Sequence, residues 1–134
     1  MEMEVLFVCS GNVYRSPVAE ALLKKFRPDV QVDSAGTNPV LPKISEGARR
    51  FLKMESASHF LKGEPEGLDE KKLDEYDLIV VMEQRHKEVV LGKCRSCEGK
   101  IVVWNIDDPY FLPGRETKIF QQIKNRVKEL ANTI

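Results

Sequence analysis

Apolar and polar positions along the chain follow two patterns, and the first predicts strands. Three segments are continuous apolar runs, typical of strands buried on both faces of a parallel sheet. In a fourth segment Val30 and Val32 are separated by Gln31, the alternation typical of an edge strand. The predicted strands cover residues 3–9, 29–35, 76–82 and 100–106, of which 29–35 is the alternating one.

The second pattern has helical spacing. In the C-terminal segment Ile119, Ile123, Val127 and Leu130 recur every three or four residues, with Lys and Glu on the other face, so this helix should cover the sheet. The first helix should begin with Ser16 as N-cap and Pro17 in the first turn, and stop at Pro28. The C-terminal helix is predicted at residues 116–134, and further helical segments at 45–56, 68–76 and 83–91.

Length and charge narrow the class of protein. A chain of 134 residues is near the commonest domain size, so one domain covering residues 1–134 is expected. Lys plus Arg and Asp plus Glu both number 21, which gives no general attraction for nucleic acids or anionic membranes. No apolar stretch is long enough to be a signal or spanning segment. We therefore expect a cytoplasmic protein, a monomer or weak dimer, with no nucleic-acid or membrane partner.

The segment from Cys9 to Ser16 leaves the first predicted strand at the sheet edge where ligands bind in open parallel sheets. Gly11 and Asn12 tolerate left-handed backbone conformations, so the chain can curl and turn successive N–H groups inward around an anion. The predicted phosphate-binding residues are Ser10, Gly11, Asn12, Val13, Tyr14 and Arg15.

The same segment favours a reactive cysteine. Loop amides and the N-terminus of the following helix would stabilise a thiolate at Cys9, and Arg15 can hold two phosphoryl oxygens at once. The Ser16 hydroxyl can accept from a helix amide while donating to the sulfur. Taken singly, Cys9 could be a core thiol, Gly11 a turn residue and Arg15 a surface charge. Their combination between a strand and a helix favours the functional interpretation.

The loop VCSGNVYRSP, residues 8–17, resembles that of the low-molecular-weight protein tyrosine phosphatases, V-C-x-G-N-x-C-R-S-P. Tyr14 is the one departure: the family usually has a second cysteine there, able to form a reversible disulfide with the nucleophile, so that protection should be absent. The resemblance extends to VDSAGT (32–37), SHFLKG (58–63), DEYDLIVVMEQRHKEVV (74–90) and DDPY (107–110).

Two neighbouring carboxyls are candidates for the general acid. Asp107 and Asp108 follow the fourth predicted strand at the same edge as Cys9, where one carboxyl could protonate a leaving oxygen and later activate water. Pro109 restricts Asp108 to an extended conformation that could aim its side chain. The residues alone leave both candidates open beside a simple Asp-Pro turn. The resemblance selects Asp108, directly before the proline.

The resemblance also implies contacts around this chemistry. Residues after Asp-Pro form an aromatic wall beside the phosphate site in the family, which makes Tyr110, and secondarily Phe111, candidates to stack on an aromatic leaving group. Val40 stands where relatives can carry an aromatic substrate contact.

Polar neighbours hold the loop asparagine of the family in its strained conformation. Ser34 matches one of these positions and would support Asn12. His59 is the candidate for another, although its separation from the third strand departs from the family pattern. His86 is expected to be a solvated helix residue.

Three cysteines are too few for a disulfide scaffold. Cys94 and Cys97 have C-x-x-C spacing but are two ligands short of a closed zinc site. They also lie too far beyond the third strand for the disulfide relay of thioredoxin-coupled arsenate reductases, which resemble this fold and loop. We expect a structural role, or a local disulfide under oxidation.

Together these features predict an α/β fold: a single-domain, doubly wound, four-stranded parallel sheet flanked by helices, with flavodoxin-like topology and strand order 2-1-3-4. The predicted function is hydrolysis of phosphotyrosine-like aryl phosphates, on a protein or a small molecule, through a phosphocysteine, with no metal and no cofactor. The alternatives are arsenate reduction, a phosphoryl carrier of the sugar-transport type and a phosphopeptide-binding module. Such carriers lack the arginine and the Asp-Pro acid, and a binding module needs no nucleophile.

Overall fold

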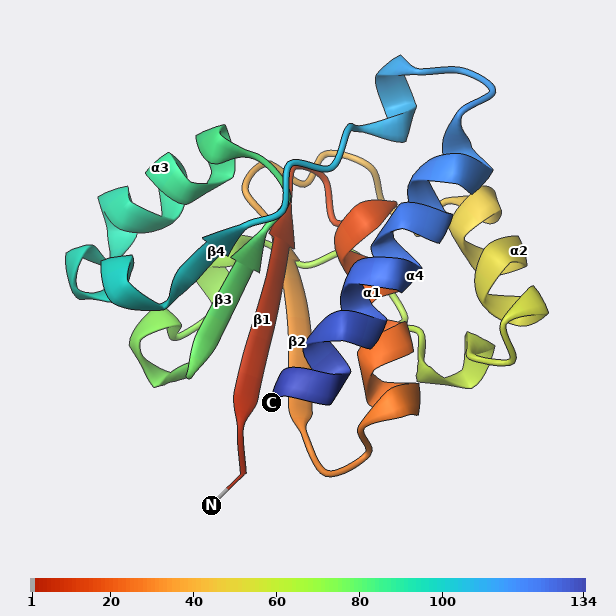
Figure 1. Ribbon diagram of the computed structural model, residues 1–134. Coiled ribbons are helices and arrows are strands. Elements are labelled where there is room, and N and C mark those ends of the chain that lie inside the picture. The colour runs from red at the N-terminus through yellow and green to blue at the C-terminus, as the bar shows by residue number, and fades with distance from the viewer. Residues whose placement is uncertain (1) are drawn as a thin grey trace.

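The computed structural model describes residues 2–134 and contains a four-stranded sheet of order β2-β1-β3-β4 (Figure 1). The strands are β1 (Glu4–Cys9), β2 (Gln31–Gly36), β3 (Leu78–Val81) and β4 (Ile101–Val103). Each neighbouring pair is parallel. The predicted sheet, its strand order and the edge position of β2 are therefore confirmed.

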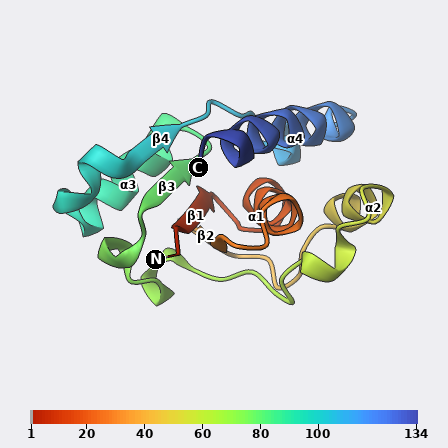
Figure 2. The same cartoon turned by 60° about the horizontal axis from the view of Figure 1, so that its bottom comes forward.

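Helices pack on both faces of this sheet. They are α1 (Arg15–Phe26), α2 (Glu46–Met54), α3 (Gln84–Lys93) and α4 (Glu116–Thr133). Along β1, Val5 and Phe7 join the core cluster with α1 and α4, whereas Leu6 and Val8 join the second cluster, which contains Val90 of α3. In Figure 2, α1 and α4 lie beside each other with α2 beyond them. The two-fold alternation of side chains along β1 thus covers both faces.

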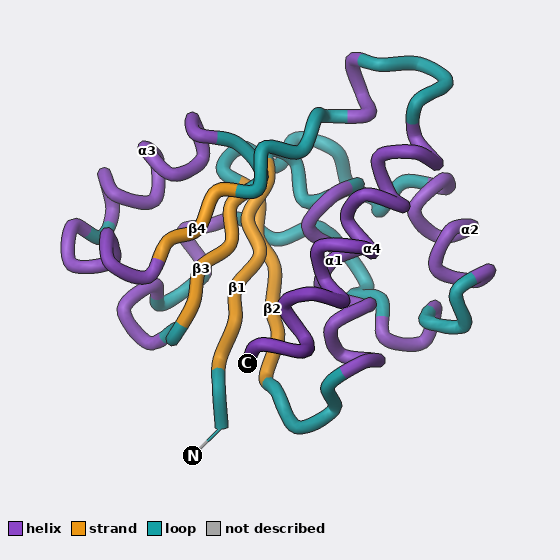
Figure 3. Tube along the Cα trace, in the orientation of Figure 1, coloured by secondary structure: helices purple, strands orange, loops and turns teal. Residues whose placement is uncertain are grey.

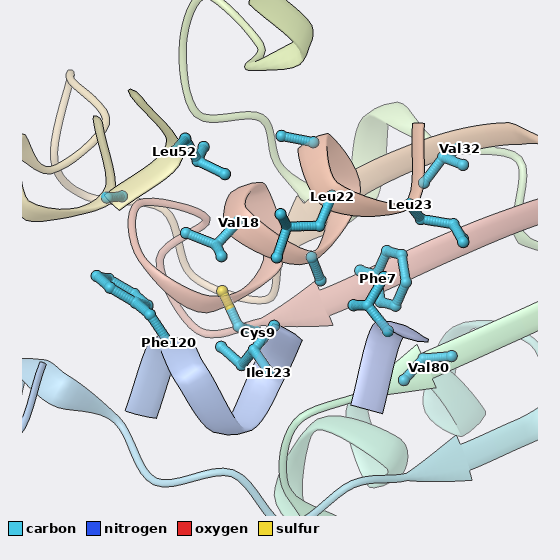
Figure 4. Packing of buried hydrophobic residues seen from close by; sticks show 14 of the residues in the cluster. Phe7, Cys9, Val18, Leu22, Leu23, Val32, Leu52, Val80, Phe120 and Ile123 are labelled. Atoms are coloured by element: carbon cyan, nitrogen blue, oxygen red, sulfur yellow. The ribbon is translucent and has the colours of Figure 1, made fainter. Parts of the chain in front are cut away.

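The predicted apolar face of the last helix is buried. Ile119, Ile123 and Val127 of α4 are all 5% exposed or less and pack in the same cluster as Phe7 and Cys9. Figure 4 shows Ile123 and Phe120 close to Cys9, at the carboxyl end of β1. This helix therefore helps to fix the end of the strand that carries the candidate nucleophile.

Residues 68–76 do not form the predicted helix. They form two short 3-10 helices, Leu68–Glu70 and Leu73–Glu75. Because Leu68 and Leu73 are five residues apart, they do not share one face of an α-helix. Each is buried separately in the second cluster, and Lys71 between them pairs with Asp33 and Glu66.

Strand β4 is shorter and more exposed than its apolar run predicts. The N–H groups of Trp104 and Ile106 still donate to Val81 and Met82, but Asn105 between them has φ 58°, a left-handed conformation that interrupts the strand. Val102 is 43% exposed because β4 lies at the sheet edge. The prediction that this run is buried on both faces is therefore wrong.

The loops that follow the strands gather at one edge of the sheet, as the teal segments in Figure 3 show. They connect β1 to α1, β3 to α3, and β4 to the 3-10 helix Pro109–Phe111. Within residues 2–134, none of the helices has the length and apolar character needed to span a membrane.

Candidate active site

The loop after β1 forms a cradle of backbone amides. Asn12 has φ 58°, the left-handed conformation expected there, and lets the chain turn sharply between Cys9 and α1. The N–H groups of Gly11, Val13 and Tyr14 have no hydrogen-bond acceptor within residues 2–134. Because unpaired amides near a helix N-terminus favour a bound anion, this loop can hold a phosphoryl group.

The sulfur of Cys9 has polar partners although the residue is only 2% exposed. It lies 2.9 Å from Ser16 Oγ and accepts the Asn12 N–H at 3.3 Å. A core thiol at a strand end would contact hydrocarbon on all sides. These two polar contacts distinguish Cys9 from such a thiol and suit a sulfur that acts as a nucleophile, as the sequence predicted.

The sequence suggested Ser16 as the N-cap of α1, and this prediction is wrong. The helix begins at Arg15, with Tyr14 as its N-cap, two residues before the predicted one, and no side-chain cap bond. Ser16 Oγ accepts from the side-chain amide of Asn12 at 2.8 Å. Its own hydrogen is therefore free to donate to the sulfur of Cys9.

A buried polar network holds Asn12 from behind. Its Nδ2 also donates to Ser34 Oγ at 3.0 Å, as the resemblance implied for Ser34. Its Oδ1 accepts from Lys62 Nζ and from the Glu66 N–H, both at 2.8 Å. Ser34 Oγ in turn donates to Glu20, which is 2% exposed. Every polar atom of the Asn12 side chain is thus engaged, which fixes its strained conformation.

The structure does not bring His59 to this network. His59 is exposed and its ring stacks against Phe60 with centroids 4.0 Å apart. Lys62, three residues later in the SHFLKG segment, contacts Asn12 instead. The basic residue of that segment was therefore the signal that sequence reasoning missed.

Gly36 lets the end of β2 pack directly against the loop. A Cβ atom on Gly36 would lie 2.6 Å from the Ser10 carbonyl oxygen and 2.9 Å from the carbonyl carbon of Gly11. The neighbouring Thr37 and Asn38 donate their N–H groups to the Cys9 and Ser10 carbonyls. The loop is thus supported on this side by backbone contacts that leave no room for a side chain.

Arg15 is a buried guanidinium, 1% exposed, with a fixed orientation. Its NH1 donates to Glu83 Oε2 and to the Ile106 carbonyl, each at 2.6 Å. With both NH1 hydrogens engaged, the Nε and NH2 edge remains for two oxygens of one phosphoryl group. Sequence reasoning missed Glu83 as the carboxylate that orients Arg15.

Of the two candidate acids, the structure brings Asp108 to the site. Asp108 is extended (φ −85°, ψ 116°), as the following proline requires, and its Oδ2 lies 3.3 Å from Arg15 NH2. Its Oδ1 accepts the Tyr110 N–H. Asp107 is exposed.

A pocket of about 320 Å³ opens above the sulfur. Tyr110, Phe111 and Val40 contribute to its walls and are 60%, 69% and 76% exposed. The rings of Tyr110 and Phe111 meet edge to face, with centroids 5.0 Å apart. The pocket is lined by Cys9, Ser10, Gly11, Val13, Tyr14, Arg15, Thr37, Asn38, Val40, Leu41, Arg85, Asp108, Tyr110 and Phe111.

The turn between β3 and α3 braces the other side of the loop. The helical pattern suggested that His86 is solvated, but its side chain is only 1% exposed. Its Nε2 lies 2.9 Å from Ser10 Oγ. Burial and the positive charge of Arg15 lower the pKa of His86 to about 4. Burial alone would raise the pKa of Glu83, but hydrogen bonds from Arg85 and Arg15 lower it to about 2. The turn therefore presents a neutral imidazole and a carboxylate at neutral pH.

Cys94 and Cys97 form a disulfide at the far end of α3, away from this edge of the sheet. Cys9 is the free cysteine among the residues described. Over that same stretch, no three His, Cys, Asp or Glu side chains come together in a way that could hold a metal ion.

The family model for low molecular weight phosphotyrosine protein phosphatase matches residues 4–134. The chain belongs to this family. It is 36% identical over 117 residues to the low molecular weight protein-tyrosine-phosphatase Wzb of Salmonella typhimurium, covering 80% of this chain and 76% of that protein. The resemblance stated from the sequence is thereby confirmed.

Solved structures of phosphatases in this family share the fold. Vibrio vulnificus Wzb in complex with benzylphosphonate superposes with a TM-score of 0.87 at 25% identity, covering 100% of both chains. The tyrosine phosphatase Wzb from Escherichia coli K30 in complex with phosphate gives 0.85 at 25% identity, covering 100% of this chain and 99% of the other. These complexes show that proteins of this fold bind phosphate and benzylphosphonate.

Proposed function

We propose that the protein hydrolyses phosphotyrosine-like aryl phosphate monoesters through a phosphocysteine intermediate. The observation that carries this proposal is the sulfur of Cys9, which meets two hydrogen-bond donors in a pocket also lined by Arg15 and Asp108. The benzylphosphonate held by the similar Vibrio vulnificus Wzb is an aryl phosphate analogue, which supports the substrate class.

In the first step the thiolate of Cys9 attacks phosphorus in line with the ester oxygen. The S–P bond forms as the P–O bond to the leaving group breaks, and Asp108 gives its proton to the departing oxygen. The amides of the loop and the free edge of Arg15 donate to the equatorial oxygens as charge develops on them.

In the second step water attacks phosphorus from the side that the leaving group vacated. Asp108, now a carboxylate, accepts a proton from this water, and the S–P bond breaks to release inorganic phosphate. The Ser16 hydroxyl and the Asn12 N–H stabilise the departing thiolate, because both already contact the sulfur. The catalytic residues in this proposal are Cys9, Arg15 and Asp108.

The walls of the pocket favour an aromatic leaving group. Tyr110 and Phe111 follow Asp108 immediately, so an aryl ring whose oxygen is protonated by Asp108 lies within reach of their faces. Val40 and Leu41 offer an apolar surface from another loop. A phosphotyrosine side chain, on a protein or as a small molecule, has the matching chemistry.

The test is hydrolysis of p-nitrophenyl phosphate in the presence of EDTA by wild type, Cys9→Ser and Asp108→Asn. We expect turnover by the wild type that EDTA does not reduce, no turnover by Cys9→Ser, and strongly reduced turnover by Asp108→Asn. Turnover retained by Cys9→Ser would refute the phosphocysteine. A parallel assay with arsenate, thioredoxin and its reductase should consume no NADPH, and consumption would favour the reductase alternative.

A further inference from the structure

The residue that follows the nucleophile makes a contact that the mechanism above does not use. Ser10 lines the pocket beside Cys9, and its Oγ lies 2.9 Å from Nε2 of His86. His86 belongs to the first turn of α3 and is separated from Ser10 by 76 residues in the chain. A polar contact this distant in sequence, with one partner fully buried, fixes the direction of the Ser10 side chain.

The hydrogen-bond partners of His86 determine its tautomer. Nδ1 accepts the N–H of Glu83 at 3.1 Å, so Nδ1 carries no hydrogen. The charged groups around the ring are Arg15, Arg85 and Glu83, and together with burial they keep the imidazole neutral at neutral pH. The hydrogen of the neutral ring is therefore on Nε2, and it is donated to Ser10 Oγ.

This assignment decides what Ser10 can do. Since Ser10 Oγ accepts from His86, its own hydrogen points away from the imidazole ring. No other group within residues 2–134 accepts that hydrogen, and Ser10 is only partly buried, on the wall of the pocket. A hydroxyl held in this way has no protein acceptor among the described residues, so it can donate to a ligand that enters the pocket.

We propose that Ser10 is a further catalytic residue, whose hydroxyl donates a hydrogen bond to an oxygen of the bound phosphoryl group, and that His86 is a positioning residue that directs this donor. The inference rests on the proposed function, because it assigns an additional contact in the same phosphate site. The donor meets phosphoryl oxygens in the bound substrate, in the transition state and in the product phosphate alike. Its loss should therefore weaken the binding of inorganic phosphate as well as kcat/KM.

Four variants test the pair. Ser10→Ala removes the donor and Ser10→Thr retains a hydroxyl. His86→Asn keeps a side-chain oxygen near the position of Nδ1, able to accept from Glu83, but is too short to reach Ser10. The double variant Ser10→Ala/His86→Asn completes a thermodynamic cycle. Thermal unfolding of each variant identifies any that fails to fold.

We expect Ser10→Ala to lower kcat/KM for p-nitrophenyl phosphate about tenfold and to raise the inhibition constant of inorganic phosphate by a similar factor, as for one hydrogen bond to a charged group. Ser10→Thr should recover most of both losses. His86→Asn should cause a smaller decrease in kcat/KM and a smaller increase in the phosphate inhibition constant than Ser10→Ala. The double variant should have the same kcat/KM and inhibition constant as Ser10→Ala. A merely structural role of His86 predicts additive losses instead.

Two results would overturn the inference: wild-type kcat/KM and phosphate inhibition in Ser10→Ala, or additive effects in the double variant. Failure of the proposed function is distinguishable from either. If wild type does not hydrolyse p-nitrophenyl phosphate, calorimetric binding of inorganic phosphate to wild type and Ser10→Ala still measures the hydroxyl contact directly. Equal affinities in that titration would equally contradict it.

Discussion

Asp108 has a contact at each side-chain oxygen, with Oδ2 3.3 Å from NH2 of Arg15 and Oδ1 accepting the Tyr110 N–H at 3.0 Å. These contacts fix Asp108 between the guanidinium that would bind the phosphoryl group and the aromatic residues that would face the leaving group. A general acid needs this position, because it must deliver its proton to the ester oxygen that joins the phosphoryl group to the leaving group.

Replacing this carboxyl should therefore slow the chemical step. Asp108→Asn keeps the shape of the side chain but cannot donate the proton, and we expect kcat to fall about 10²-fold or more. The loss should be larger for phenyl phosphate than for p-nitrophenyl phosphate, whose better leaving group depends less on protonation. Steady-state kinetics with both substrates measure this difference.

Asp107→Asn is the matched control, because the neighbouring carboxyl is exposed. Its kcat should remain within about twofold of wild type, as for most surface substitutions. An equal loss in both variants, or the same loss for both leaving groups, would contradict the role given to Asp108.

Gly36→Ala should damage the site through the loop it supports. The added Cβ would meet the Ser10 carbonyl oxygen at 2.6 Å, so either the loop or β2 must move, at a cost of about 1–3 kcal/mol in stability. We expect kcat/KM to fall as well, because the displaced carbonyl belongs to the phosphate-binding loop. Chemical denaturation and kinetics with p-nitrophenyl phosphate measure the two effects.

Gly63→Ala provides the comparison, since a Cβ there meets no atom within 4 Å. It should leave stability and kinetics nearly unchanged. If Gly36→Ala behaved like Gly63→Ala, the close packing of β2 against the loop would not matter to function.

His86 should make stability depend on pH. Its pKa in the folded protein is about 4 against an ordinary 6.5, because burial and Arg15 disfavour the charged ring. The unfolded chain therefore binds more protons between these values, so the free energy of unfolding should fall as pH is lowered from 6.5 to about 4. Above 6.5 the contribution of His86 is fully present.

Urea unfolding of wild type and His86→Asn across this window tests the assignment. The stability advantage of wild type should shrink toward low pH, while His59→Asn, which removes an exposed ring, serves as the control. A constant difference between wild type and His86→Asn would show that the buried ring does not resist protonation.

The sequence predicted the parts of the site that lie close together in the chain. Cys9, Arg15 and Ser16 lie within one strand-loop-helix segment, so local pattern and sheet topology sufficed for them. The same reasoning placed Asp107 and Asp108 after the fourth predicted strand but left both open as the acid, and the family resemblance selected Asp108. Ser16 was nevertheless assigned as N-cap, because the pattern does not show that the N-cap lies two residues earlier, at Tyr14.

The supporting contacts could not be predicted in this way because they are long-range. Lys62 reaches Asn12 across 50 residues and Glu83 reaches Arg15 across 68. The helical pattern around His86 does not reveal which face the loop after β1 will cover. The same limit applies to β4, where a single left-handed residue, Asn105, ended a run whose composition favoured a longer strand.

Because Tyr14 stands where the family usually has a second cysteine, the enzyme should be sensitive to peroxide. Oxidation of a thiolate gives a sulfenic acid, which a neighbouring thiol can trap as a reversible disulfide before it proceeds to a sulfinic acid. Cys94 and Cys97 are paired with each other, so neither can trap Cys9. Wild type treated with hydrogen peroxide should therefore recover less activity in dithiothreitol than Tyr14→Cys.

Tyr14→Ser separates the gain of a thiol from the loss of the tyrosine and should recover no better than wild type. Activity after peroxide and dithiothreitol, relative to untreated enzyme, is the measurement. Full recovery of wild type would mean that another mechanism protects the nucleophile.

The most direct test of the account is whether the phosphoryl group passes through the sulfur of Cys9. Wild type mixed with p-nitrophenyl phosphate, quenched in acid within the first turnovers and digested for mass spectrometry should yield a peptide phosphorylated at Cys9, and Cys9→Ser should yield none. Steady release of p-nitrophenol with the phosphoryl group never on Cys9, or found on another residue, would contradict the account.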